Sequence, residues 1–182
     1  MLATERPAGF PDESWTIETD IPNAMRRSWV RKVVCGQVLD VGCNRGYASC
    51  VMALSADSVM CVDISPEDLA SASELASMCG IKNIQFQHGD AYSLPFADKS
   101  FDTVTLLEVL EHLERPEVAV SEALRVARRR VVITVPAKGH MTETPGHIWD
   151  FAVQDIVSML PSADYAEQHA PFTFVLHKVG SD

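Results

Sequence analysis

Four short apolar segments in the first 110 residues each end at or near an acidic residue. They cover residues 38–41, 58–62, 84–87 and 104–107, and the acids are Asp40, Asp63, Asp90 and Glu108. Helix-like segments follow three of them, at residues 47–54, 66–78 and 117–127. This alternation favours an open, mostly parallel sheet with helices on both faces, whose ligands bind outside the carboxyl ends of the strands. The four acids therefore border one predicted crevice.

The two ends of the chain show other patterns. Residues 1–17 contain prolines and glycine with little periodicity, so we expect an arm over the surface, followed by an amphipathic helix capped by Asp20. Near the other end, residues 130–135 read as a fifth core strand and residues 153–160 as a short helix. Residues 172–179 alternate in a way suited to an antiparallel edge strand. We assign residues 136–151 to a substrate or metal loop.

Composition limits the class of protein. A chain of 182 residues with 47% hydrophobic residues is long enough for a single well-buried domain, which we take to be residues 1–182. It has no apolar run near the ~20 residues that span a bilayer and no signal-like start, so we expect a cytoplasmic protein without a membrane partner. The net charge of -10 disfavours RNA as a partner, and we interpret the basic clusters around Arg26 and Arg128 as solvated helix faces. The five cysteines are expected to be reduced and structural. The oligomeric state is left open.

A glycine turn follows the first strand. Gly42 and Gly46 let the backbone approach a ligand closely, and Asn44 between them tolerates positive φ. Dinucleotide-binding proteins also carry such turns, but Asp40 just before this one would repel phosphates. An acid there prefers a cationic or hydroxyl-bearing ligand. Asp63 is suited to accept hydrogen bonds from two ribose hydroxyls, and Asp90 from an adenine amino group.

The fourth strand leads into Glu108, Glu111 and His112. If the chain becomes helical there, positions i, i+3 and i+4 share one face, so both carboxylates and the imidazole converge. This arrangement suits a metal ion or an acid/base site. The alternative is an ordinary solvated helix start, where acids are favoured by the helix dipole.

Taken together, several segments resemble the successive motifs of class I S-adenosylmethionine-dependent methyltransferases. They are VLDVGCNRGY, the acid of VMCVDIS, QHGDAYSLPFADKSFDTV and RVVITVP, and they cover about residues 37–136. The resemblance implies a Rossmann-like doubly wound α/β sheet with strand order 3-2-1-4-5-7-6 and strand 7 antiparallel. It also implies that S-adenosylmethionine contacts Asp40, Gly42, Cys43, Asn44, Gly46, Asp63, Ile64, Asp90, Ala91 and Leu107. Asn44 replaces the middle glycine of the usual D-x-G-x-G-x-G pattern, a change we expect to be tolerated.

A second resemblance concerns a metal site. The E-x-x-E-H pattern followed by H-x-W-[DE] is similar to the metal site of small-RNA 3′-terminal 2′-O-methyltransferases, and ubiquinone-biosynthesis O-methyltransferases share a related arrangement. It implies Glu108, Glu111, His112 and His147 as ligands. Mg²⁺, Mn²⁺, Fe²⁺, Co²⁺ and Zn²⁺ are all chemically admissible for such a set. Glu108, His112 and His147 are also the candidate catalytic residues, with a histidine as general base if no metal binds.

These features predict a metal-assisted O-methyltransferase that acts on a small molecule with vicinal hydroxyls, such as a catechol or a diol. The alternatives are an RNA 3′-terminal ribose 2′-O-methyltransferase and a non-catalytic partner protein with a cofactor fold. A dinucleotide-dependent oxidoreductase is disfavoured by Asp40.

Overall fold

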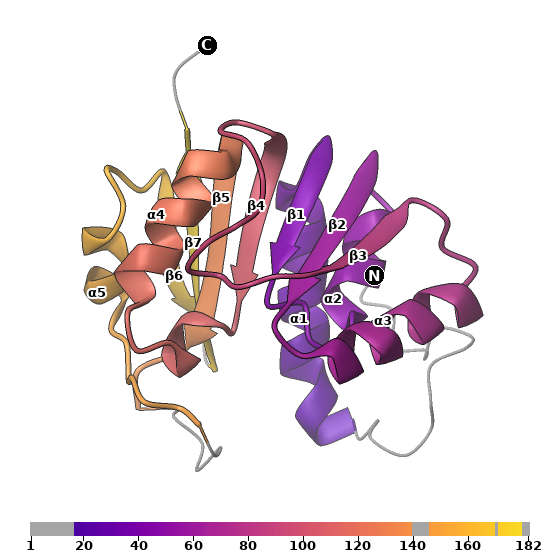
Figure 1. Ribbon diagram of the computed structural model, residues 1–182. Helices are drawn as coiled ribbons and strands as arrows, with labels where there is room; N and C mark the ends of the chain where they lie inside the picture. The colour runs from indigo at the N-terminus through magenta and orange to yellow at the C-terminus, as the bar shows by residue number, and fades with distance from the viewer. Residues whose placement is uncertain (1–16, 140–145, 170, 180–182) are drawn as a thin grey trace.

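Seven strands form one sheet in the order β3-β2-β1-β4-β5-β7-β6 (Figure 1). The computed structural model describes residues 17–139, 146–169 and 171–179. The strands are β1 (Gln37–Val41), β2 (Ser58–Asp63), β3 (Ile84–His88), β4 (Phe101–Leu107), β5 (Ala127–Pro136), β6 (Tyr165–His169) and β7 (Phe172–Lys178). β7 is antiparallel to both β5 and β6, and the other pairs are parallel. The predicted fold class and strand order are confirmed.

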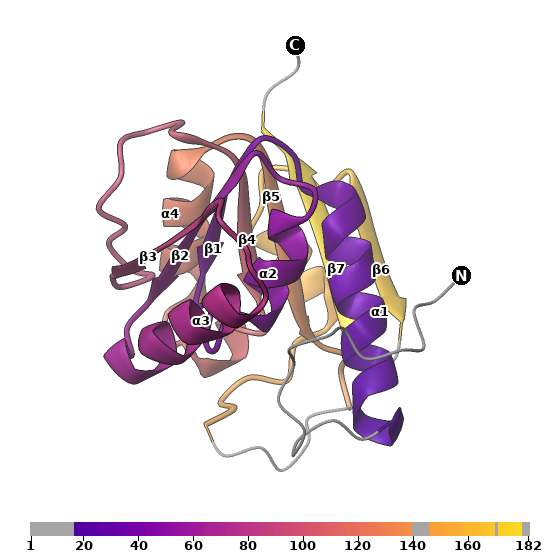
Figure 2. The same ribbon diagram turned by 90° about the vertical axis from the view of Figure 1, so that its right-hand side faces the viewer.

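Helices cover both faces of this sheet. They are α1 (Ile17–Val33), α2 (Tyr47–Ala53), α3 (Pro66–Met78), the 3-10 turn η1 (Leu110–His112), α4 (Pro116–Val126) and α5 (Val153–Ser158). The first three lie on one face and α4 and α5 on the other (Figures 1 and 2). α3 begins as expected, since the Ser65 hydroxyl accepts a hydrogen bond from the Asp68 backbone N–H at 3.1 Å and Pro66 occupies the first turn.

The core has two layers because successive strand residues point to opposite faces. On β1, Val38 packs in the cluster under α1 and α2, and its neighbour Leu39 packs in the cluster under α4. Both side chains are fully buried. A central parallel strand buried on both faces reads as a continuous apolar run, which explains the strand pattern of the sequence. In the part of the chain that the structure describes, no helix combines the length and apolarity needed to cross a membrane.

Three local expectations were wrong. α1 begins at Ile17 and runs through Pro22, so Asp20 lies inside the helix and not at its cap. β7 is not an edge strand, because β6 pairs with its free side. The sequence of β6, YAEQH, is short and polar and carries no clear strand signal. Arg128 lies on β5, which follows α4 without a loop, and not on a helix face.

Two expected segments lie wholly or partly outside the described residues. The predicted arm is residues 1–17, of which the structure describes only Ile17, the first residue of α1. The predicted substrate or metal loop, residues 136–151, is described only at residues 136–139 and 146–151.

Candidate active site

A cavity of about 570 Å³ opens at the carboxyl ends of β1, β2 and β4, between α1 and η1. The expected cofactor residues that line it are Asp40, Gly42, Cys43, Asn44, Asp63, Ile64 and Leu107. Glu108 and His112 line it as well. The cavity therefore extends from the glycine turn to Glu108 and His112, as expected for a ligand site at the carboxyl ends of neighbouring strands.

The glycine turn is shaped by two close approaches. Gly42 has φ +71°, and a Cβ there would lie 2.6 Å from a methyl of Val109. Gly46 has φ +78°, and its Cβ would lie 2.8 Å from that of Ala72 on α3. Asn44 has φ +49°, which confirms that it adopts the left-handed conformation in place of a glycine. The turn thus packs closely against the segment after β4 and against α3.

Asp40 forms a buried polar contact at the cavity floor. Its two carboxylate oxygens accept hydrogen bonds from the Ser49 hydroxyl at 2.5 Å and the Thr105 hydroxyl at 2.6 Å. Burial raises the pKa of Asp40 above its ordinary value, and these hydrogen bonds offset part of that effect. Both oxygens already have protein donors, so Asp40 is held in a fixed position between α2 and β4.

Asp63 is held at the end of β2 by backbone donors. Its carboxylate accepts hydrogen bonds from the N–H of Asn44 at 2.7 Å and the N–H of Ser65 at 2.9 Å. Ionised carboxylates have about four lone-pair sites, so capacity for ligand hydroxyls remains.

Three of the expected cofactor residues do not line the cavity: Gly46, Asp90 and Ala91. Gly46 belongs to the turn and packs on α3 instead. Asp90 is exposed, and its side chain accepts a hydrogen bond from the Tyr92 N–H at 2.9 Å in a local turn. The structure thus places Asp90 beyond β3 and outside the hollow that the other acids border.

Glu108 does not join the predicted metal cluster. The chain does not continue as an α-helix after β4: Glu108 adopts φ +58°, and only a single 3-10 turn follows. Its carboxylate instead forms an ion pair with Arg26 of α1 at 3.3 Å. Burial raises the pKa of Glu108, and the Arg26 charge opposes that rise. The expectation that Glu108, Glu111 and His112 share one helical face is therefore wrong.

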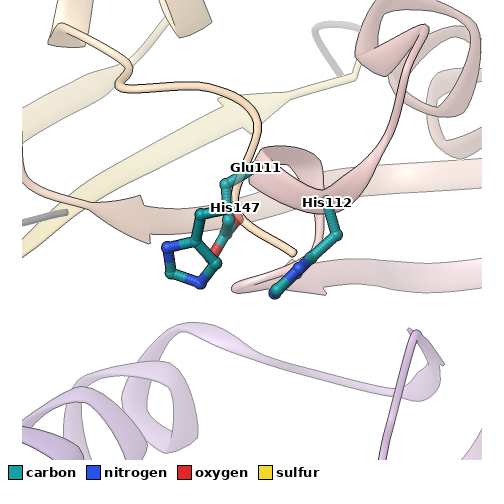
Figure 3. A group of neighbouring side chains, drawn as sticks. All are labelled: Glu111, His112 and His147. Atoms are coloured by element: carbon teal, nitrogen blue, oxygen red, sulfur yellow. The ribbon is translucent and has the colours of Figure 1, made fainter. Parts of the chain in front are cut away.

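The remaining three predicted ligands do come together. The side chains of Glu111, His112 and His147 offer ligand atoms that lie within 4.8 Å of one another (Figure 3). The imidazole rings of His112 and His147 are 4.6 Å apart between centroids. The backbone N–H of Ile148 donates to the Glu111 carbonyl at 2.8 Å and joins the loop to η1. His147, a loop residue 36 positions away in sequence, is thus brought beside Glu111, the acid of η1.

The protonation chemistry of this group suits a cation. Glu111 is fully buried, and neither of its carboxylate oxygens has a hydrogen-bond partner among the described residues. Burial, with the nearby Glu108 charge, raises the pKa of Glu111 to about 8. Burial lowers the pKa of His147, whose Nδ1 also has no partner in the described part of the chain. His112 Nδ1 lies 3.1 Å from the Gly146 carbonyl, and donation to it would leave Nε2 free as an acceptor or ligand.

Sequence reasoning missed the contribution of α1. Asn23, Arg26 and Arg27 line the cavity, and the Arg26 guanidinium also lies over the Phe172 ring at 4.9 Å. The expected solvated helix face is therefore wrong for Arg26 and Arg27. Their i, i+3, i+4 spacing was the available signal, because it places all three on one side of the helix.

Comparison with known proteins identifies the family. A family model described as a methyltransferase domain matches residues 39–135, more than half of the chain. The chain belongs to this family. Together with the strand order, the match shows a class I S-adenosylmethionine-dependent methyltransferase. The glycine turn and the cavity beside it fit that cofactor.

Named relatives include both N- and O-methyltransferases. The chain is 32% identical over 111 residues to norajmaline N-methyltransferase of Rauvolfia serpentina, a match that covers 59% of this chain and 38% of that protein. It is 30% identical over 123 residues to the ubiquinone biosynthesis O-methyltransferase of Paracidovorax citrulli, covering 63% and 52% respectively. The matched region thus spans at most about half the length of these relatives.

A solved structure shares the fold. The magnesium protoporphyrin IX methyltransferase of Synechocystis PCC 6803, crystallised with bound S-adenosylhomocysteine, superposes with a TM-score of 0.73 at 18% identity. The superposition covers 93% of this chain and 90% of that chain.

Proposed function

We propose that this methyltransferase transfers the methyl group to one of two neighbouring hydroxyls of a small molecule, with help from a divalent metal ion. The observation that carries the proposal is the group of Glu111, His112 and His147 beside the cofactor cavity. A buried carboxylate with no partner among the described residues, facing two imidazoles, is costly unless a ligand satisfies it. A cation would satisfy it.

The cofactor is expected to lie along the cavity lining. In this proposal Gly42, Cys43 and Asn44 border the methionine part of S-adenosylmethionine. Asp63 accepts from the ribose hydroxyls, and Ile64, which is largely exposed, packs against the adenine. Asp40 supports this arrangement through its hydroxyl partners and need not contact the cofactor directly.

The donor set narrows the choice of metal. With Glu108 paired to Arg26, the remaining set has one carboxylate and two imidazoles. The two imidazole nitrogens favour Zn²⁺ or Fe²⁺ over Mg²⁺, which prefers oxygen and water, and the mixed set with one carboxylate still admits Co²⁺ and Mn²⁺. A divalent cation supplies a lowered hydroxyl pKa and a fixed orientation for the acceptor when it is bound.

The residues of the chain would share the remaining tasks. His112 and Glu108 line the cavity at its junction with the metal group, where they can orient the acceptor. In the absence of a metal, His147, whose pKa is lowered by burial, is the candidate to accept the hydroxyl proton.

Methyl incorporation from labelled S-adenosylmethionine tests the proposal. The substrates are catechol, phenol and a short RNA with a free 3′ end, each with added Mn²⁺, Co²⁺ or Zn²⁺ or with excess chelator. We expect methylation of catechol and not of phenol, and loss of activity with chelator. Glu111→Ala and His147→Ala should abolish the metal-dependent activity yet keep S-adenosylhomocysteine affinity within about threefold.

A matched control separates this effect from general damage. His88 is exposed on β3 and belongs to neither the cavity lining nor the metal group, so His88→Ala should retain activity. Catechol methylation that survives both excess chelator and the two site variants would overturn the metal assignment. Methylation of RNA alone would favour the ribose 2′-O-methyltransferase. Tight S-adenosylhomocysteine binding without turnover on any of these substrates would favour a non-catalytic partner.

A further inference from the structure

We infer that Trp149 provides a stacking surface for an aromatic ring of the methyl acceptor. The acceptor would then be a catechol-like aromatic diol and not an aliphatic one. This inference rests on the proposed function, because it concerns the molecule that enters beside Glu111, His112 and His147.

The indole of Trp149 is held in a fixed orientation. Its Nε1–H donates to the Leu113 carbonyl at 2.7 Å. Its ring stacks on Phe151, with centroids 5.9 Å apart and planes at 18°. Phe151 is only 4% exposed and belongs to the core cluster under α4 and α5. A ring positioned by the core and by a main-chain hydrogen bond loses little freedom when a ligand binds to it.

The same ring is nevertheless open to solvent. Trp149 is 42% exposed and its neighbour Ile148 is 54% exposed. The single polar atom of the indole already has its partner, so the exposed part is apolar. By contrast, Trp29 packs against Phe174 and Tyr165 within the fold. An oriented, apolar and exposed aromatic face is suited to stack against another ring.

Its position connects this face to the reaction site. The Leu113 that accepts the indole hydrogen bond also lines the cofactor cavity, as does His112 next to it. Trp149 follows His147 by two residues, and the Ile148 N–H between them is bonded to Glu111. Trp149 itself is not among the residues that line the cavity, so the indole would meet the acceptor at the cavity edge, beside Leu113.

Charge favours a small aromatic molecule over a nucleic acid. A base at an RNA end also stacks on aromatic side chains, but RNA binding draws most of its affinity from basic residues that neutralise phosphates. The chain carries 25 acidic and 15 basic residues, for a net charge of -10.

Binding of two matched ligands tests the inference without turnover. Catechol and cis-1,2-cyclohexanediol both present neighbouring hydroxyls on a six-membered ring, but only catechol is aromatic. Each is titrated by calorimetry into the full chain loaded with S-adenosylhomocysteine and Mn²⁺. We expect catechol to bind at least tenfold more tightly, which corresponds to about 1.4 kcal/mol.

Variants then assign the preference to Trp149. Trp149→Leu should remove most of the tenfold preference and leave the affinity for cyclohexanediol unchanged. Trp149→Phe keeps an aromatic ring without the N–H and should keep part of the preference. Leu54→Ala removes another exposed apolar side chain, 61% exposed and outside the cavity lining, and should change neither affinity. A role in anchoring the loop would lower both affinities together.

The possible results have distinct meanings. Equal affinities for the two diols, or a preference that Trp149→Leu leaves intact, would overturn the inference even if methyl transfer occurs. Selective catechol binding that depends on Trp149, without any methyl transfer, would uphold the stacking surface and count against the proposed function. If Trp149→Leu does not fold, Trp149→Phe decides: a reduced preference for catechol with unchanged affinity for cyclohexanediol upholds the inference, and an unchanged preference overturns it. The inference would also be overturned if the protein bound RNA more tightly than catechol and this RNA binding depended on Trp149.

Discussion

Replacing Glu111 by glutamine should make the metal-free protein more stable at pH 8 than the wild type. Glu111 is fully buried, and its oxygens have no hydrogen-bond partner among the described residues. Burial raises its pKa in the folded protein from the ordinary 4.5 to about 8. Below pH 4.5 the carboxyl is protonated in both states and has no effect. As the pH rises from 4.5 to 8, the unfolded chain releases the proton and the folded chain holds it, so stability falls.

The magnitude follows from the size of the shift. Each pKa unit corresponds to about 1.36 kcal/mol, so a shift from 4.5 to about 8 costs on the order of 5 kcal/mol at pH 8. This is a large share of the roughly 5–15 kcal/mol that stabilises an ordinary domain. Glutamine cannot ionise, so Glu111→Gln should remove this cost while keeping nearly the same shape.

Urea unfolding of both proteins, in excess chelator at half-unit steps from pH 5 to pH 8.5, measures the effect. The free energies of unfolding should be close at pH 5 and diverge by several kcal/mol at pH 8, with the variant more stable. Glu114→Gln makes the same change at an exposed position in the next turn and should follow the wild type. Parallel curves for wild type and Glu111→Gln over this range would refute the reasoning. Replacing the chelator with a divalent cation should raise the stability of the wild type at pH 8 and leave that of Glu111→Gln unchanged.

Two further predictions concern the glycine turn and the cavity floor. Gly46→Ala should cost about 2–5 kcal/mol, because left-handed strain of about 1–2 kcal/mol adds to a clash with α3 of about 1–3 kcal/mol. Gly80 has a similar φ, but a Cβ there would meet no atom within 4 Å, so chemical denaturation of Gly80→Ala should show only the cost of the backbone strain. Equal losses of stability in the two variants would contradict the clash between Gly46→Ala and α3. Thr105→Val should cost about 1–3 kcal/mol in the same assay by removing a donor to buried Asp40. Thr173→Val removes a buried hydroxyl that has no partner in the described part of the chain and should be neutral or stabilising; a loss as large as that of Thr105→Val would contradict this account.

Much of the fold could be predicted because its signals are local. Central strands buried on both faces require continuous apolar runs, and the cap at Ser65 and the left-handed Asn44 depend on neighbouring residues alone. The positions of Asp40 and Asp63 at strand ends follow from the same alternation. The residues of β6 could not be located from the sequence pattern, and its place in the strand order came only from the family resemblance, because an edge strand with polar side chains has no periodic apolar pattern.

The site depended on contacts between distant parts of the chain. The sequence by itself determined the methyltransferase fold, the glycine turn and the proximity of Glu111 to His112. Only the tertiary structure decided that Glu108 pairs with Arg26 of α1 and that, of the four expected ligands, Glu111, His112 and His147 alone lie together. The physical reason is the left-handed backbone at Glu108, which ends helical continuation after β4, so that Glu108 and Glu111 no longer share one helical face. Residue spacing describes which side chains share a face only while the helix continues.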